Sequence, residues 1–384
     1  MNRPVRPISL TLGGIPDLPD IIGRGPATDL IVDLLVRGQS VLFTGDRRYG
    51  KTCLSRLVEA RLRDAGHKVV RVSAERASFG DFLDAFAHEV EQQLGNAVTR
   101  ELTQWRATFK AGPVEVSRTP STRGLDELLE LAAKQGSPSR IVLIVDEVPI
   151  LASAMEHEHP GSGQAVLDTL RRVRQQHSAG LSMLMLGSIG FHHVARRSPG
   201  SLNDITKEQV GPVTSEDGAY LARCLMAGER VDCTDPAAVA AAMHVAAEGI
   251  PYYIQHLVKD ARDRARTDGP ATPETPGALV DAALRHEDDP WNLRHYRDRV
   301  PEYYPGREEL VYAVLDVYAD ADDPLRIDDA RRLLATRMEE QPPARSTLVT
   351  LVELLEQDHY LMRIEDASTF RSGLVRRAWL AYRR

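Results

Sequence analysis

The chain has 384 residues, 42% of them hydrophobic and 27% charged, and its formal net charge is -7. This length exceeds the size at which a single hydrophobic core usually stops growing, so we expect two or three domains and exclude a peptide-sized or disulfide-stapled fold. A protein that binds DNA through phosphate contacts usually carries a net basic domain or stripe, so any such surface must be local here.

The N-terminal stretch 1–20 is broken by prolines and lacks the apolar core of a secretory signal. The apolar runs IVLIV and LSMLMLG are far too short to span a bilayer. These features predict a cytoplasmic protein without a membrane partner. The cysteines Cys53, Cys224 and Cys233 show no paired spacing of the metal-binding kind, so we expect them to be reduced and structural.

From Ser40 to Val213, short β-branched runs alternate with helical periodicity, which predicts a parallel sheet flanked by helices. The predicted strands span residues 40–45, 68–74, 140–147, 181–188 and 207–213. The predicted helices span residues 51–66, 79–95, 124–136 and 163–177. The stretch MEHEHPG at 155–161 fits a polar loop, because it lacks a further ligand pair at a spacing typical of metal sites.

After Thr214 the strand patterns end, and helices are predicted at 215–228, with Ser215 as N-cap, at 235–249 and at 251–266. The stretch 267–277, rich in Pro, Thr and Gly, is predicted as a loop or linker. From Pro301 onward, three helices, two short strands around a polar turn and a last helix follow the order of a winged helix-turn-helix. We therefore predict an α/β domain at 1–213, a helical lid with its linker at 214–300 and a winged helix at 301–384.

The stretch FTGDRRYGKT at 43–52 fits the pattern G-x-x-x-x-G-K-[ST] and lies between a predicted strand and a predicted helix, as that pattern requires. Glycines let backbone N–H groups close around phosphate oxygens, and the helix N-terminus adds positive potential. Lys51 would reach the β- and γ-phosphates, and the Thr52 hydroxyl would bind Mg²⁺. The residues predicted to bind the nucleotide here are Gly45, Asp46, Arg47, Arg48, Tyr49, Gly50, Lys51, Thr52 and Cys53.

The stretch RIVLIVDE is an apolar strand that ends in Asp146 and Glu147, and so dry a strand does not end in paired carboxylates without a reason. Asp146 would hold Mg²⁺ through water, and Glu147 would orient or deprotonate the water that attacks the γ-phosphate. The strand LSMLMLGS ends in Ser188, which would hydrogen-bond the γ-phosphate or the attacking water if its strand lies beside the other two. We therefore predict Lys51, Glu147 and Ser188 as catalytic residues and Thr52 and Asp146 as magnesium ligands.

Five segments in this order, IIGRG at 21–25, GDRRYGKT, LIVDE, LMLGS and GIPYYI at 249–254, together resemble the AAA+-related STAND and archaeal-type P-loop ATPases. The resemblance implies an α/β P-loop NTPase fold with a five-stranded parallel sheet in the order 5-1-4-3-2, a helical lid and a C-terminal winged helix. It also places Gly23 and Arg24 near the adenine and ribose, and brings Pro251 of the lid to the nucleotide. The chain departs from the family at Gly25, where an acidic residue is usual.

The resemblance implies ATP and Mg²⁺ as ligands, with ADP as product. Archaeal relatives often carry an arginine where this chain reads SPGSLNDI, so slow hydrolysis is expected. Arg196 and Arg197, just upstream, have two interpretations: an arginine finger onto a neighbour's nucleotide, or a solvated basic turn.

The predicted winged helix at 307–384 has 12 arginines and no lysine against 15 acidic residues, which disfavours broad phosphate binding. Its last segment, from Tyr360 to the end, has six arginines and two acids, so a local basic surface stays open. We favour a molecular switch that acts through a partner protein or self-assembly, as in signalling or defence. The alternatives are a DNA-associated ATPase of initiation, transposition or regulation, and a scaffold that binds ATP and scarcely hydrolyses it.

Overall fold

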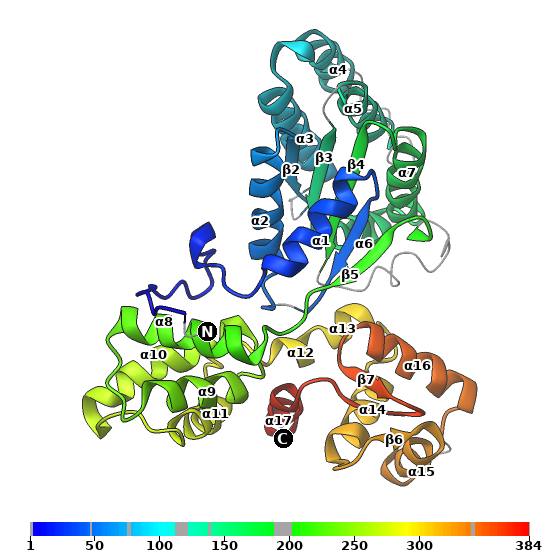
Figure 1. Ribbon diagram of the computed structural model, residues 1–384. Helices are drawn as coiled ribbons and strands as arrows, with labels where there is room; N and C mark the ends of the chain where they lie inside the picture. Colours follow the sequence, from blue (N-terminus) through cyan, green and yellow to red (C-terminus); the bar gives the residue numbers. More distant parts are fainter. Residues whose placement is uncertain are drawn as a thin grey trace. The chain divides into compact units, whose positions relative to one another are not determined.

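The computed structural model describes residues 3–46, 48–74, 78–111, 122–136, 140–187, 202–338 and 342–383. The chain divides into two compact units, Ile15–Gly211 and Pro212–Arg384, and the N-terminal segment up to Gly14 clusters with the second unit (Figure 1). Within the described residues, no helix is long and apolar enough to cross a membrane.

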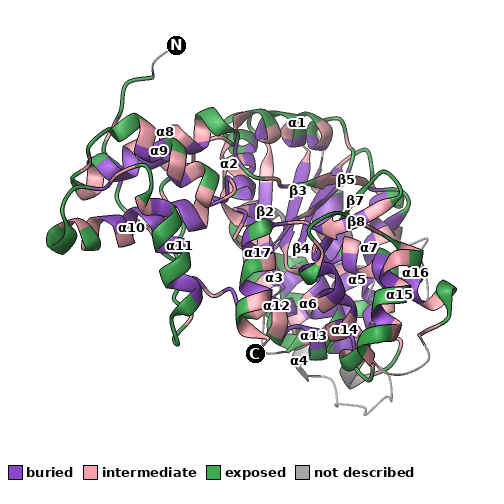
Figure 2. Ribbon diagram, turned by 90° about the horizontal axis from the view of Figure 1, so that it is seen from below, coloured by how far each residue is buried: buried purple, intermediate pink, exposed green. Residues whose placement is uncertain are grey.

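The first unit contains a five-stranded parallel sheet in the order β2-β3-β4-β1-β5, which confirms the predicted order. The strands β3 and β4 are apolar at almost every position and buried on both faces, as parallel strands between two helical layers are (Figure 2). The strand bounds are β1 Val41–Thr44, β2 Lys68–Ser73, β3 Ile141–Asp146, β4 Leu181–Gly187 and β5 Thr206–Gln209.

Helices pack against this sheet, and one large apolar cluster joins the strands to the layer that contains α3, α5, α6 and α7. The helices α1 and α2 pack on each other and contact the sheet separately from that layer. The helical bounds in this unit are η1 Leu18–Asp20, α1 Gly25–Val36, α2 Lys51–Asp64, α3 Phe79–Leu94, η2 Gly95–Ala97, α4 Thr99–Ala111, α5 Arg123–Lys134, α6 Val148–Glu158 and α7 Ser162–Gln176.

The predicted polar loop at 155–161 is wrong over its first half, because α6 extends to Glu158. The side chains of Val148, Leu151, Ala152 and Met155 are all buried, and their i, i+3, i+4, i+7 spacing is the helical signal that the histidines obscured. The helix α4 was also not predicted.

The fifth strand ends earlier than predicted. The pairing of β5 with β1 stops at Gln209, and one further bond, from Val210 N to Thr44 O at 2.9 Å, extends the ladder. Pro212 then follows, and a proline has no N–H with which to continue a ladder. The chain passes from the first unit to the second at this point.

The helices that follow Thr214 are α8 Ser215–Glu229, α9 Pro236–Ala246, α10 Pro251–Asp268, α11 Thr275–Arg285, α12 His295–Asp298 and α13 Val300–Tyr303. The N-cap of α8 is Thr214, whose side chain accepts from Asp217 N, so the predicted cap at Ser215 is one residue late. The predicted linker at 267–277 is partly wrong, because α11 begins inside it. Buried Ala271 exchanges backbone hydrogen bonds with Asp232 and Thr234, which fixes this stretch against the loop before α9.

The C-terminal part contains α14 Glu308–Asp320, β6 Leu325–Arg326, α15 Ile327–Met338, α16 Arg345–Gln357, β7 Leu361–Ile364, β8 Ala367–Phe370 and α17 Gly373–Tyr382. The strands form an antiparallel sheet in the order β6-β8-β7. The buried side chains of its helices share one apolar cluster with Tyr296, Val300 and Tyr304 from the preceding segment.

The aromatic and basic segment around α12 and α13 is packed inside the second unit. Buried Arg299 donates from Nε to the Tyr360 hydroxyl at 2.9 Å and from Nη2 to Asp358 O at 2.8 Å. Its guanidinium also lies over the rings of Tyr296 and Tyr360, at 4.7 and 4.3 Å from their centroids. This arginine therefore joins the segment to the turn between α16 and β7.

Replacing Arg299 by Met is expected to lower the free energy of unfolding by about 2–4 kcal/mol, because it leaves buried acceptors without their donor. Urea denaturation of the full chain would measure the loss. Arg294→Met is the control: Arg294 is exposed and its guanidinium lies over Tyr382 at 4.9 Å, so a loss below about 1 kcal/mol is expected. Equal losses in the two variants would contradict a structural role for Arg299.

Candidate nucleotide-binding site

The phosphate loop joins β1 to α2, as the pattern requires. Its first glycine, Gly45, packs so closely against Val210, just after β5, that a Cβ atom on Gly45 would lie 2.2 Å from Val210 Cγ1. Its second glycine, Gly50, has φ 89°, in the left-handed region that favours glycine, and is the N-cap of α2. The motif glycines are therefore required by the close packing at Gly45 and the backbone turn at Gly50.

Lys51 is the first residue of α2 and its side chain is buried. Its Nζ atom donates to Gly45 O at 2.8 Å and to Asp46 O at 2.9 Å, so the ammonium group lies over the loop. The next residue, Thr52, is half-buried in the first turn of the same helix. The positive end of α2 and the Lys51 charge thus act on the same volume, which suits a phosphate group.

The acidic pair follows β3 directly. Burial raises the pKa of Asp146, and the nearby charge of Glu147 raises it further, while the charges of Arg71 and Lys51 act in the opposite direction. Glu147 has φ 55° and ψ 41°, a left-handed conformation that costs a residue with a side chain about 1–2 kcal/mol.

Strain of this kind persists where surrounding structure holds the residue, and it concentrates at functional sites. Glu147 is also the N-cap of α6, and its carbonyl accepts from Ile150 N at 3.0 Å. The sharp turn places a second carboxylate next to Asp146 at the carboxyl edge of the sheet.

The sequence pattern did not single out Arg71, which lies in β2 beside this pair. Its Nη1 atom is 4.0 Å from Asp146 Oδ2, its Nε donates to Glu59 Oε2 at 2.6 Å and its Nη2 donates to Ser55 Oγ at 2.8 Å. Ser55 Oγ in turn donates to Thr52 O at 2.9 Å. Arg71 thereby links the helix that follows the phosphate loop to the acidic strand.

Two sequence features could have found this network. Arg71 is the one charged residue inside the run VVRVS, and Thr52, Ser55 and Glu59 share one face of α2 at i, i+3 and i+7. Although burial raises the pKa of Glu59, hydrogen bonds and charges from Arg71 and Arg63 lower it overall.

Arg24, predicted near the adenine and ribose, is buried beside the phosphate loop. Its Nη2 atom donates to Tyr49 O at 2.7 Å and its Nη1 atom donates to Gly211 O at 2.8 Å. Gly23, which precedes it, has φ 76°. Cys53 lies close enough for the Arg24 charge to act on it, but burial is the larger effect and raises the pKa of the thiol.

Some of the predicted site residues lie outside the described residues. The strand β4 lies between β3 and β1, and its last residue, Gly187, pairs with Thr44 of β1. Ser188 follows Gly187 but lies outside the described residues. Arg47 and the candidate finger residues Arg196 and Arg197 also lie outside them. Pro251 belongs to the second unit, where it is the first residue of α10.

The residues present fit a nucleotide-bound magnesium ion. Among the described residues, no group of three or more His, Cys, Asp or Glu side chains could hold a metal by itself. Magnesium is usually held by one or two carboxylates together with substrate phosphates and water. The hydroxyl of Thr52 and the carboxylate of Asp146 are the oxygen ligands that such an ion would need. Burial disfavours the charged form of Asp146, and a bound cation would offset this cost.

Comparison with known proteins supports this assignment. Residues 36–194 match the family model described as AAA domain, and this range contains the phosphate loop and the acidic pair. No protein of curated function matches the chain.

Solved structures share the fold over nearly the whole chain. A Walker-type ATPase of Pyrococcus abyssi is 16% identical, with 98% of this chain and 99% of that chain covered and a TM-score of 0.62. The ORC2 protein of Aeropyrum pernix, in its ADPNP-ADP complexes, is 14% identical, with 99% and 95% covered and a TM-score of 0.55. Identities this low show similarity of fold.

The sheet order, the phosphate loop between β1 and α2, and the AAA domain match define the class of the first unit. It has the P-loop NTPase fold, and its residues 36–194 match the AAA domain model.

Proposed function

We propose that this protein binds ATP with Mg²⁺, hydrolyses it slowly to ADP, and uses the bound nucleotide as a switch. In this proposal Lys51 holds phosphate oxygens, Thr52 and Asp146 hold the magnesium ion, and Glu147 orients or deprotonates the attacking water. The magnesium ion supplies charge neutralisation on the phosphates. The observation that carries the proposal is the acidic pair after β3, where Glu147, in its left-handed conformation, stands beside half-buried Asp146.

Adenine as the base is supported by the resemblance and by the fold shared with ORC2, which was solved with ADPNP and ADP. Gly23 and Arg24 stay our candidates for the adenine side, and Ser188 for the γ-phosphate. Pro251, at the start of α10, stays the candidate lid contact. Slow turnover is expected because the stretch SPGSLNDI lacks the arginine that archaeal relatives often carry there. An arginine finger is worth about 10³–10⁵ in rate where it operates.

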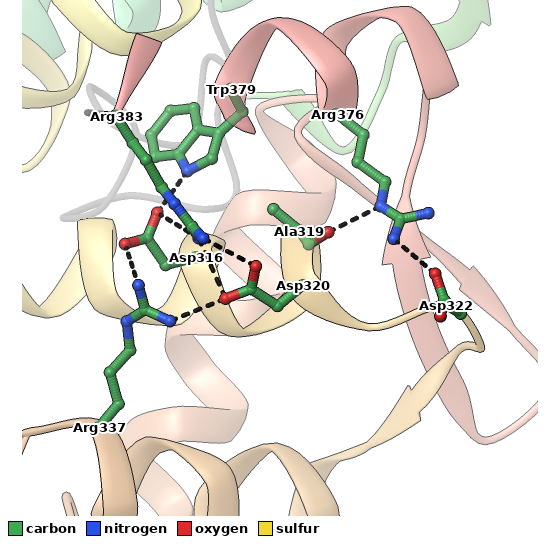
Figure 3. A network of polar contacts seen from close by, with 8 residues as sticks. All are labelled: Asp316, Ala319, Asp320, Asp322, Arg337, Arg376, Trp379 and Arg383. Carbon is green, nitrogen blue, oxygen red and sulfur yellow. Dashed lines mark hydrogen bonds and ion pairs between the residues drawn. The ribbon is translucent and has the colours of Figure 1, made fainter. Parts of the chain in front are cut away.

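The C-terminal part has the element order that we propose as a winged helix, with β7 and β8 as the wing. Several of its arginines form ion pairs with acidic side chains of the same chain. Arg383 pairs with Asp320 at 2.8 Å, Arg337 with Asp316 at 2.9 Å and Arg376 with Asp322 at 3.1 Å (Figure 3).

The same holds for two more arginines of the terminal segment. Arg377 pairs with Asp281, and Arg363 pairs with Glu356 at 3.2 Å. Four of the six arginines after Tyr360 therefore have acidic partners, so the local basic surface that the sequence suggested is largely neutralised. This favours a partner protein or self-assembly over duplex DNA.

A mobility-shift experiment on the full chain tests this preference. Duplex DNA of mixed sequence is titrated at 50 and 200 mM salt, with Mg-ATP and without it. We expect weak binding that ATP does not strengthen. A protein that makes 6–10 phosphate contacts loses about 10³–10⁵ in affinity over that salt range. Tight binding with that salt dependence, strengthened by ATP, would establish the DNA-associated alternative instead.

A further inference from the structure

The stretch Gln209–Val213 joins the first unit to the second and is held at both ends by hydrogen bonds. It is called the linker from here on and is distinct from the stretch 267–277. On the first-unit side, Val210 donates its N–H to Thr44 O, and its side chain packs where a Cβ of Gly45 would be. The backbone of the phosphate loop therefore cannot shift at Gly45 without displacing Val210.

Arg24 adds a second connection at the same end. Its guanidinium spans from Tyr49 O in the phosphate loop to Gly211 O in the linker, with two hydrogen bonds of 2.7 and 2.8 Å. A buried guanidinium has a rigid fork geometry, so it transmits a displacement of one carbonyl to the other.

The second-unit end of the linker is held by the turn between α9 and α10. Val213 N donates to Gly249 O at 2.9 Å, and a Cβ on Gly249 would lie 2.8 Å from Val213 O. Glu248 and Gly249 both have positive φ, at 51° and 68°. Two consecutive left-handed residues form a sharp turn with little freedom, so the linker and this turn move together.

Glu248 connects the turn to the last helix of the chain. Its Oε2 accepts from Ser372 Oγ at 2.6 Å and its Oε1 accepts from Leu374 N at 2.7 Å. Ser372 is itself the N-cap of α17, through Val375 N at 3.1 Å. The carboxylate therefore holds the positive end of α17, an interaction that the helix dipole strengthens.

We propose that Arg24 and Glu248 are positioning residues at the two ends of one relay, which couples the phosphate loop to the N-terminus of α17 through the linker. This relay rests on the proposed nucleotide switch and names the contacts by which nucleotide state reaches the C-terminal part. Arg24 fixes the loop to the linker, and Glu248 fixes the linker turn to α17.

Hydrogen exchange on the full chain tests the relay at the Leu374 and Val375 amides, with Mg-ADPNP and with Mg-ADP. In the wild type the exchange rate of these amides is expected to differ about fivefold or more between the two nucleotides. Glu248→Ala and, independently, Ser372→Ala are expected to reduce this ratio to near one while both nucleotides still bind. Arg24→Lys is also expected to lower the ratio from the other end, because an ammonium group does not reproduce the fork. Since Arg24 is also the candidate contact for the adenine side, this variant is compared with the wild type at saturating concentrations of each nucleotide.

Glu365→Ala is the matched control, because Glu365 is exposed and shares a positive φ of 55°. It is expected to keep the wild-type ratio. If nucleotide binds to the wild type and the ratio is one, or if Glu248→Ala and Ser372→Ala keep the wild-type ratio, the relay is wrong and the ATPase proposal stands. If neither nucleotide binds in calorimetry, the proposed function fails, and the relay fails with it.

Discussion

Glu147→Gln is expected to reduce ATP hydrolysis by about 10²–10⁴-fold while nucleotide binding is retained. The amide is similar in shape to the carboxylate, but it cannot accept a proton from the attacking water. It also removes the charge that raises the pKa of Asp146, so the magnesium ligand is not weakened by the change. Phosphate release under single-turnover conditions measures the chemical step, and calorimetry with Mg-ADPNP measures binding.

Glu101→Gln serves as the control for this variant. Glu101 is exposed on α4 in the same unit, and the substitution changes the net charge by the same amount. It should release phosphate at the wild-type rate. Equal rates for the wild type and Glu147→Gln would remove Glu147 from the catalytic assignment and leave the acidic pair a structural feature.

Lys51→Ala is expected to weaken Mg-ATP binding by about 10–100-fold, because a hydrogen bond to a charged group is worth about 1.5–3 kcal/mol. In the wild type, ATP at 100 times its dissociation constant should stabilise the folded protein by about 2.7 kcal/mol. For a unit of this size that is a rise of about 5–10 °C in melting temperature. At the same ATP concentration a 10–100-fold weaker affinity leaves Lys51→Ala about 1.4 to 0.4 kcal/mol of this stabilisation, so its rise should be about half of the wild-type rise or less.

Lys207→Ala controls for the loss of a positive charge, since Lys207 is exposed on β5 in the same unit. It should keep the full ATP-dependent rise. Because Lys51 also holds two loop carbonyls, the melting temperature of each variant without nucleotide must be compared as well. An undiminished rise in Lys51→Ala would contradict the phosphate-binding role.

Much of the fold of the first unit could be predicted, because a parallel sheet requires continuous apolar strands. The runs that became β3 and β4 are of this kind, and their predicted limits differ from the observed ones by one residue at each displaced end. Errors occurred where a helix carried a polar end, as in α6, and where the chain changed units, as at Val210. In both places tertiary contacts decide the local structure, and these contacts are not visible in a short window of sequence.

The candidate site was predictable where a chemical pattern lies within a few consecutive residues. The phosphate loop and the acidic pair are such patterns, and in the structure the charge of Lys51 acts to lower the pKa of Asp146. Arg71 is different, because its partners Ser55 and Glu59 lie in another element and meet it through the packing of α2 on β2. The role of Arg24 in bridging two carbonyls also depends on distant segments.

The N-terminal segment has a consequence for the order in which the chain is completed during synthesis. Ile8 is buried, its N–H donates to Cys224 O at 3.1 Å, and its backbone lies where a Cβ of Gly228 would be. Cys224 and Gly228, which Ile8 contacts, are therefore synthesised about 200 residues after Ile8. The first unit, Ile15–Gly211, is by contrast one continuous stretch of the chain. Because domains generally fold as units during synthesis, the P-loop domain can fold before α8 is made, and Ile8 becomes buried only afterwards.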